Sequence, residues 1–141
     1  MFELHERLEQ DSMLIGHLNL CQVRLSKDAR YPWLILIPER NDIKEIHHLG
    51  NADQRLLMQE SCQVAQVMEA VLSPDKINVA SLGNMVPQLH LHHVARFASD
   101  DAWPGPIWGA HPALLESEHE LEQKSHQWQQ WLSRVEGFVV G

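Results

Sequence analysis

The stretch Gln88-Leu89-His90-Leu91-His92-His93 decides how this 141-residue chain folds and what chemistry it can perform. Strict alternation of polar and apolar residues is typical of a β-strand, whose successive side chains point to opposite faces of a sheet. Gln88, His90 and His92 therefore project from one face. The two leucines and His93 project from the other face, where we expect the leucines to enter the core. This places His90 and His92 side by side.

Two neighbouring imidazoles on a rigid strand suit chemistry at phosphorus. Neutral imidazole is a nucleophile near neutral pH, and imidazolium can protonate a leaving group. One of His90 and His92 can attack phosphorus while the other assists the departing group. The turn Leu82-Gly83-Asn84-Met85, just before the strand, would present backbone N–H groups and an amide to the same phosphate.

A His-x-His pair on a strand is also a common pair of metal ligands. A metal site needs a third ligand, and the sequence offers His111, His47 or His48 without a characteristic spacing. We therefore predict no metal site. His90 and His92 could also be hydrogen-bonded histidines without a function, and His47-His48 suit a loop or the start of a helix.

The rest of the chain predicts an α+β fold. Four segments have the alternation or the apolar run of a β-strand: 18–25, 33–37, 77–80 and 87–97. Three segments carry apolar residues at helical spacing: 2–10, 54–72 and 112–135. We expect an antiparallel sheet of about five strands, with one long helix between strands and a C-terminal helix.

Composition and charge limit the class of protein. With 44% hydrophobic residues, the chain can fill one core, which predicts a single domain over 1–141. No apolar run approaches the roughly 18 residues of a membrane span, and no secretory signal is recognisable. The net charge of −8 argues against a nucleic-acid partner. Cys21 and Cys62 lie far apart, which predicts reduced thiols and a cytoplasmic protein.

The region from about 18 to 96 resembles the histidine triad (HIT) superfamily of nucleotide hydrolases and transferases. Members carry His-x-His-x-His followed by two apolar residues, and 83–97 is similar to this motif with its preceding turn. The segment 75–79 looks like the family's asparagine-bearing strand, and 28–38 is similar to the strand pair beneath the nucleoside. The resemblance implies a HIT-like domain with its core at about 18–97, followed by a C-terminal loop and helix at 98–141.

The resemblance also implies an activity and its residues. The middle triad histidine, here His90, would attack phosphorus and form a nucleotidyl-histidine that water or another acceptor resolves. The third, here His92, would contact phosphate oxygens and assist the leaving group. The expected substrate-binding residues are Gln88, Asn84, Gly83, Met85, Asn78, Ser81 and Arg96.

By the same resemblance, the substrate is a small nucleotide, either a dinucleoside polyphosphate such as diadenosine tetraphosphate or a nucleoside phosphoramidate. No cofactor is expected, although a divalent cation could accompany the substrate phosphates. No nucleic acid and no membrane are expected as partners. A homodimer is expected, because family members commonly form one.

Three positions depart from the family's pattern and leave a second hypothesis open. Gln88 replaces the first histidine and removes a titratable group, Asn84 replaces a glutamine, and Met85 replaces a hydroxyl-bearing residue that reaches the phosphate. The chain could therefore be a nucleotide-binding or regulatory module with weak or no turnover. We favour the enzyme, because His90 and His92 are both present.

Several other residues allow two interpretations. Arg96 could hold an anionic ligand or form an ion pair at the end of its strand. Trp103 and Trp108 could stack on a base, but packing of their proline-rich loop is the favoured interpretation. We expect His93 to lie in the core or an interface. The tryptophans of the last helix suit the core or a subunit interface.

Overall fold

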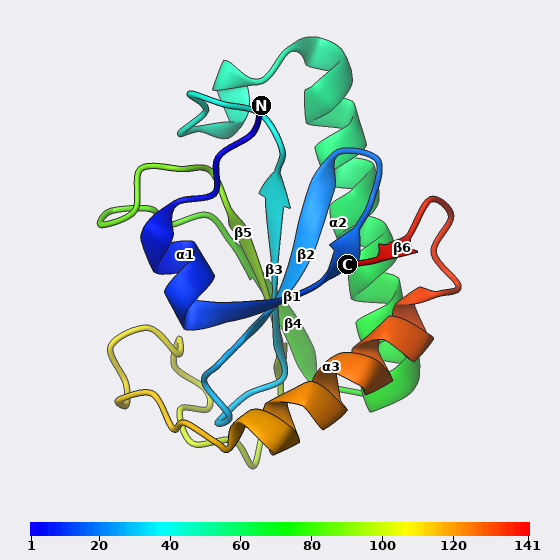
Figure 1. The fold of residues 1–141 in the computed structure, drawn as a ribbon. Coiled ribbons are helices and arrows are strands. Elements are labelled where there is room, and N and C mark those ends of the chain that lie inside the picture. The colour runs from blue at the N-terminus through cyan, green and yellow to red at the C-terminus, as the bar shows by residue number, and fades with distance from the viewer.

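The computed structural model describes residues 1–141 and contains one antiparallel sheet in the order β4-β5-β3-β2-β1-β6 (Figure 1). Its strands are β1 (Ser12–His17), β2 (Cys21–Ser26), β3 (Trp33–Pro38), β4 (Lys76–Ala80), β5 (Leu91–Arg96) and β6 (Val139–Val140). The helices are α1 (Glu6–Asp11), the 3₁₀ turn η1 (Ile46–His48), α2 (Asn51–Leu72) and α3 (Glu118–Leu132). The predicted α+β fold is confirmed.

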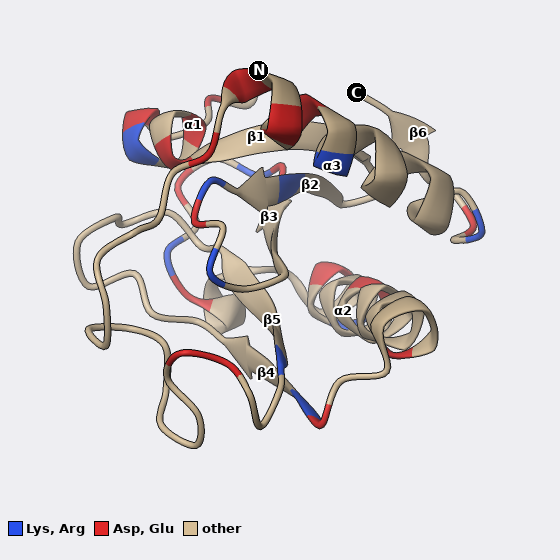
Figure 2. Cartoon of the chain, turned by 90° about the horizontal axis from the view of Figure 1, so that it is seen from below, with Lys and Arg blue, Asp and Glu red and all other residues tan.

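Helices cover one face of the sheet, and loops cover most of the other (Figure 2). Helices α2 and α3 pack on the first face over a core cluster of 20 buried residues, which includes Leu34, Leu91 and Trp128. On the second face, α1 packs Leu8 against Ile35 of β3. The second face is therefore covered by loops and one short helix, and loops are the segments on which binding residues most often lie.

Strand β5 lies inside the sheet, between β3 and β4. His92 is opposite Ile35 on one side and Ala80 on the other. His93 is opposite Leu34 and Val79. All six β5 residues are buried, and His92, His93 and Val94 are paired with both neighbouring strands, so this part of β5 holds its side chains rigidly.

Helix α2 and the hairpin it packs against are joined by a buried carboxylate. Glu60 is only 2% exposed and accepts hydrogen bonds from the backbone N–H groups of Leu20 and Cys21 at 2.9 and 3.0 Å. A buried carboxylate needs such donors, and here they fix the start of β2 against the helix. None of the helices is both long and apolar enough to cross a membrane.

Strand boundaries differ from the prediction where the alternation of apolar and polar residues does not match the backbone pairing of the strands. Strand β1 was not predicted, and residues 18–20, expected in a strand, form the turn that joins β1 to β2. Leu18 and Leu20 are buried within this turn and so imitate the alternation of a strand. The strand predicted from 87 begins only at Leu91, because Leu89 donates its N–H to Ile43 instead of to β3.

The C-terminal helix begins at Glu118, later than predicted. Ser117 caps it by accepting a hydrogen bond from the Glu120 N–H. Before the cap, Leu114 exchanges hydrogen bonds with the loop after β2, through Asp28 and Ala29. The tryptophan stripe of this helix belongs to the core, since Trp128 is buried there.

Candidate active site

His90 and His92 lie side by side on the loop-covered face of the sheet. Their ring centroids are 4.9 Å apart, and the ring planes are nearly perpendicular, at 81°. Their exposures are 6% and 7%, so each ring shows little more than one edge to solvent. His93 points to the other face, where its Nε2 lies 2.7 Å from the Ser61 hydroxyl of α2. The alternation predicted for these three histidines is present.

The hydrogen bond of His90 leaves one ring nitrogen free to attack. Its Nδ1 lies 2.6 Å from the backbone carbonyl oxygen of Gln88, which can only accept. The proton therefore sits on Nδ1, and Nε2 carries a lone pair. Burial lowers the pKa of His90 below its usual range, although the hydrogen bond to Gln88 opposes this shift. A buried, neutral ring with a free Nε2 has the form of a nucleophile.

His92 has the opposite tautomer. The indole N–H of Trp33 donates to its Nδ1 at 3.0 Å, and an indole nitrogen cannot accept. The proton of His92 therefore sits on Nε2. Burial, followed by the neighbouring His90 and His93, lowers the pKa of His92 to about 3. The site thus presents a nitrogen lone pair on one ring and an N–H donor on the next.

A cleft of about 420 Å³ opens beside the histidine pair. Three segments far apart in the chain form it: α1, the strands with the turn before β5, and the loop after β5. Its lining residues are Arg7, Leu8, Asp11, Ser26, Trp33, Ile35, Leu82, Gly83, Asn84, Met85, Val86, His90, His92 and Trp108. Half of these residues are apolar. Arg7, the one Lys or Arg residue among them, forms an ion pair with Asp11 at 3.5 Å. The cleft therefore combines an apolar wall with polar groups from the histidine pair, the turn before β5 and α1.

Of the predicted substrate-binding residues, the structure brings three into this cleft. Gly83, Asn84 and Met85 form the turn beside the histidines. Gly83 has φ of 77°, a conformation that glycine adopts without strain, so the backbone can make its turn at this position. Met85 is 82% exposed at the rim. Ser81 is exposed and does not line the cleft.

Gln88, at the first position of the motif, turns its side chain toward the N-terminal segment. Its Oε1 accepts from the His5 N–H at 2.8 Å, and its Nε2 donates to the Glu3 carbonyl at 2.9 Å. The side chain does not line the cleft, and only the backbone carbonyl contacts His90. Gln88 therefore anchors the segment that leads into α1, which brings Arg7 to the cleft.

Replacing Gln88 by alanine should loosen this segment. Two hydrogen bonds are lost, each worth about 0.5–1.5 kcal/mol, so backbone amides of residues 3–8 should exchange with solvent about tenfold faster. Hydrogen–deuterium exchange measured by mass spectrometry checks this. Replacement of the exposed Gln123 of α3 by alanine is the matched control. Unchanged exchange in Gln88→Ala would show that the amide does not hold the segment.

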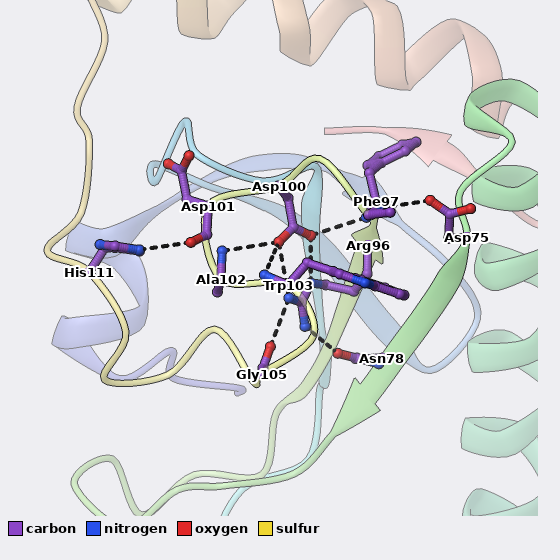
Figure 3. A network of polar contacts seen from close by, with 11 residues as sticks. Asp75, Asn78, Arg96, Phe97, Asp100, Asp101, Ala102, Trp103, Gly105 and His111 are labelled. Carbon is purple, nitrogen blue, oxygen red and sulfur yellow. Dashed lines mark hydrogen bonds and ion pairs between the residues drawn. The ribbon is translucent and has the colours of Figure 1, made fainter.

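Arg96 and Asn78 belong to a network of polar contacts around the loop after β5 (Figure 3), and neither residue lines the cleft. The guanidinium of Arg96 donates to both carboxylate oxygens of Asp100, at 2.8 and 3.1 Å. It also donates to Asn78 Oδ1 and to the Gly105 carbonyl, both at 2.8 Å. Arg96 is 2% exposed and is paired with Asp100. Of its two predicted roles, ligand binding and ion pairing, the structure therefore shows the ion pair. Both residues are occupied in holding the loop after β5.

The two loop tryptophans have different neighbours. Trp108 lines the cleft, with its ring centroid 5.3 Å from that of His92. Trp103 lies near the Arg96 guanidinium, 5.8 Å from the ring centroid to Cζ.

Sequence reasoning missed Trp33 and the α1 residues Arg7, Leu8 and Asp11, all of which line the cleft. Alternation along the strand 33–37 could have assigned Trp33 to the same face as Ile35. It could not have placed Trp33 beside His92, because that depends on the pairing of β3 with β5.

The candidates for a third metal ligand lie elsewhere. His111 Nε2 is hydrogen-bonded to the Asp101 carbonyl at 2.9 Å. His47 and His48 pack against each other before α2, with ring centroids 4.6 Å apart. No group of three or more His, Cys, Asp or Glu side chains is arranged to hold a metal ion.

Comparison with known proteins identifies the family. The HIT domain family matches residues 7–99. A histidine triad protein of Marinobacter aquaeolei is 44% identical, with a TM-score of 0.91 over 96% of this chain and 98% of that chain. Histidine triad proteins of Sinorhizobium meliloti and Bradyrhizobium japonicum are 45% and 41% identical, with TM-scores of 0.88 and 0.87. Both matches cover 92% of this chain and 96% of the other.

No match was found among curated proteins. The family match nevertheless spans well over half of the chain, and the three related structures share more than 40% of its residues over nearly their full length. The chain therefore belongs to the HIT domain family of histidine triad proteins.

Proposed function

We propose that this protein is a nucleotide hydrolase or nucleotidyl transferase that cleaves a phosphorus-linked bond to a nucleoside monophosphate. The observation that carries the proposal is the pair of complementary tautomers on His90 and His92. A free imidazole nitrogen can attack phosphorus, and an adjacent N–H can bind the oxygen on which charge develops. Membership of the HIT family supports a nucleotide as the substrate.

His90 is the nucleophile in this proposal. Its Nε2 forms a bond to the α-phosphorus, and the bond from phosphorus to the leaving group breaks, with its electron pair going to the leaving atom. The ring becomes positively charged as it attacks. The Gln88 carbonyl stabilises that charge by accepting the Nδ1–H at 2.6 Å. Water then attacks phosphorus, the bond from phosphorus to Nε2 breaks with its electron pair returning to the neutral ring, and the proton lost by the water passes to solvent.

His92 and the turn before β5 would stabilise the phosphoryl group. The Nε2–H of His92 donates to a phosphate or leaving-group oxygen, and backbone N–H groups of Gly83, Asn84 and Met85 add further donors. Arg7 would contact a more distant phosphate, either directly or beside a divalent cation carried by the substrate. The apolar lining around Leu82 and Trp108 suits the nucleoside.

The test is to trap the covalent intermediate. The protein is incubated with diadenosine tetraphosphate or with an adenosine phosphoramidate, quenched in acid-free denaturant during turnover, digested and analysed by mass spectrometry. We expect one adenylyl group on His90. Turnover without an adduct on His90 would overturn the mechanism. Binding of both compounds without any turnover would show that the protein is a nucleotide-binding module instead.

A further inference from the structure

Trp33 makes the one side-chain hydrogen bond that His92 forms within the protein. We infer that Trp33 is a positioning residue that fixes the proton of the neutral His92 ring on Nε2, and that the site therefore favours phosphoanhydrides over phosphoramidates. The first half of the inference concerns the free protein. The second half rests on the proposed function.

The geometry fixes His92 between two indoles. Trp33 stands at the start of β3 with its ring centroid 5.4 Å from that of His92, at an interplanar angle of 61°. Trp108 packs on the ring from the loop after β5, 5.3 Å away, without a hydrogen bond. The two indoles also contact each other edge to face, at 6.1 Å. Only Trp33 can therefore determine which ring nitrogen of His92 carries the proton.

The groups around His92 do not favour a charged ring. Burial lowers the pKa of His92 most, and its titratable neighbours along the chain, His90 just before β5 and His93 within it, lower it further. Helix α1 contributes Arg7 and Asp11 to the cleft wall, and neither is hydrogen-bonded to His92. Strand β3, the turn before β5 and the loop after β5 contribute no charged side chain to the cleft. A carboxylate on Nδ1 would stabilise the imidazolium, whereas the indole N–H that occupies this position opposes it.

This protonation state has a consequence for the leaving group. Neutral His92 could transfer its Nε2 proton only by becoming an imidazolate, so it donates a hydrogen bond and keeps the proton. Cleavage of a phosphoanhydride releases a phosphate oxygen that is stable as an anion and needs no proton. Cleavage of a phosphoramidate releases an amine, whose nitrogen must gain a proton as the P–N bond breaks. The site therefore suits the phosphoanhydride.

The first experiment measures the tautomer of His92 in the free protein by ¹⁵N–¹H long-range correlation NMR. In the wild type we expect one signal pattern, with the proton on Nε2, unchanged between pH 5.5 and 8. In Trp33→Phe we expect a mixture of tautomers, and in Trp108→Phe the wild-type pattern. A wild-type His92 that titrates in this range, or a Trp33→Phe variant with the wild-type tautomer, would overturn the inference.

The second experiment compares kcat/KM for diadenosine tetraphosphate with kcat/KM for an adenosine phosphoramidate. We expect the wild type to prefer the tetraphosphate, and kcat/KM for the tetraphosphate to fall by at least about tenfold in Trp33→Phe, because part of the His92 population then carries no proton on Nε2 to donate to a phosphate oxygen. Trp131→Phe, in α3, should keep the wild-type preference. A wild type that prefers the phosphoramidate would refute the specificity. Absence of turnover on both compounds would refute the proposed function and leave the NMR result to decide the role of Trp33.

Folding of the variant is controlled separately. If Trp33→Phe does not fold, benzothienylalanine can be incorporated at position 33, since it replaces the indole N–H by sulfur in a ring of the same shape. The same NMR and kinetic outcomes are expected from it.

Discussion

Replacement of His90 by alanine should abolish turnover of nucleotide substrates and leave the fold intact. The attacking nitrogen is lost, so we expect kcat to fall by at least about 10⁴-fold. The structural cost should be small, because the side chain makes one hydrogen bond, to the Gln88 carbonyl, worth about 1 kcal/mol. The rate is obtained by measuring, by chromatography, the AMP released from diadenosine tetraphosphate over time.

Two comparisons make this result specific to the nucleophile. His92→Gln keeps a hydrogen-bond donor in the site and should lose less, about 10²- to 10³-fold. His126→Ala removes an exposed histidine of α3 and should change nothing. Free imidazole should partly restore turnover in His90→Gly, since it can occupy the emptied position. A His90→Ala protein with more than a tenth of the wild-type rate would exclude His90 as the nucleophile.

Replacement of Asp100 by asparagine should give the largest loss of stability, about 3–5 kcal/mol in the free energy of unfolding. The carboxylate is 6% exposed and receives two hydrogen bonds from Arg96. It also accepts from the backbone N–H groups of Phe97, Ala102 and Trp103. An asparagine would place an amide N–H among these donors and leave the buried guanidinium without its counter-charge.

Urea unfolding measures this loss, and Asp101→Asn is the matched control. Asp101 pairs with Arg30, but its side chain is 50% exposed, so that substitution should change the free energy of unfolding by less than about 1 kcal/mol. Equal effects of the two substitutions would show that the buried network does not stabilise the fold.

The same carboxylate predicts how stability depends on pH. The Arg96 hydrogen bond, the largest cause, lowers the pKa of Asp100 to about 2 from a usual value of 3.8. Because the folded pKa lies below the unfolded one, this contribution is fully present above about pH 4. It is lost as the pH falls from about 4 toward 2. Urea unfolding across this range should show a smaller decrease in Asp100→Asn than in the wild type.

The sequence by itself determined the features that depend on local periodicity. Alternation of side chains is a property of the extended backbone, so His90 and His92 could be assigned to one face and His93 to the other before any neighbour was known. The helical stripe that became α2 was readable for the same reason. The motif at 83–97 was enough to identify the family, which the family match and the structural relatives confirm.

Local periodicity failed where another part of the chain competed for the backbone. Leu18 and Leu20 alternate with a polar residue but lie in a turn, because β1 supplies the strand that pairs with β2. Gln88 was expected to face the same way as His90. Its segment precedes the regular strand, and its amide is bound by the N-terminal segment.

Only the tertiary structure decided the partners that give each site residue its chemistry. Trp33 reaches His92 from 59 positions away because β3 is the neighbour of β5 in the sheet. Asp100 reaches Arg96 because the loop after β5 folds back on it. The face of a side chain follows from its own backbone, but its hydrogen-bond partner follows from strand order, register and loop path. These are set by burial of the whole core, so the tautomers of His90 and His92 could not be predicted from their own strand.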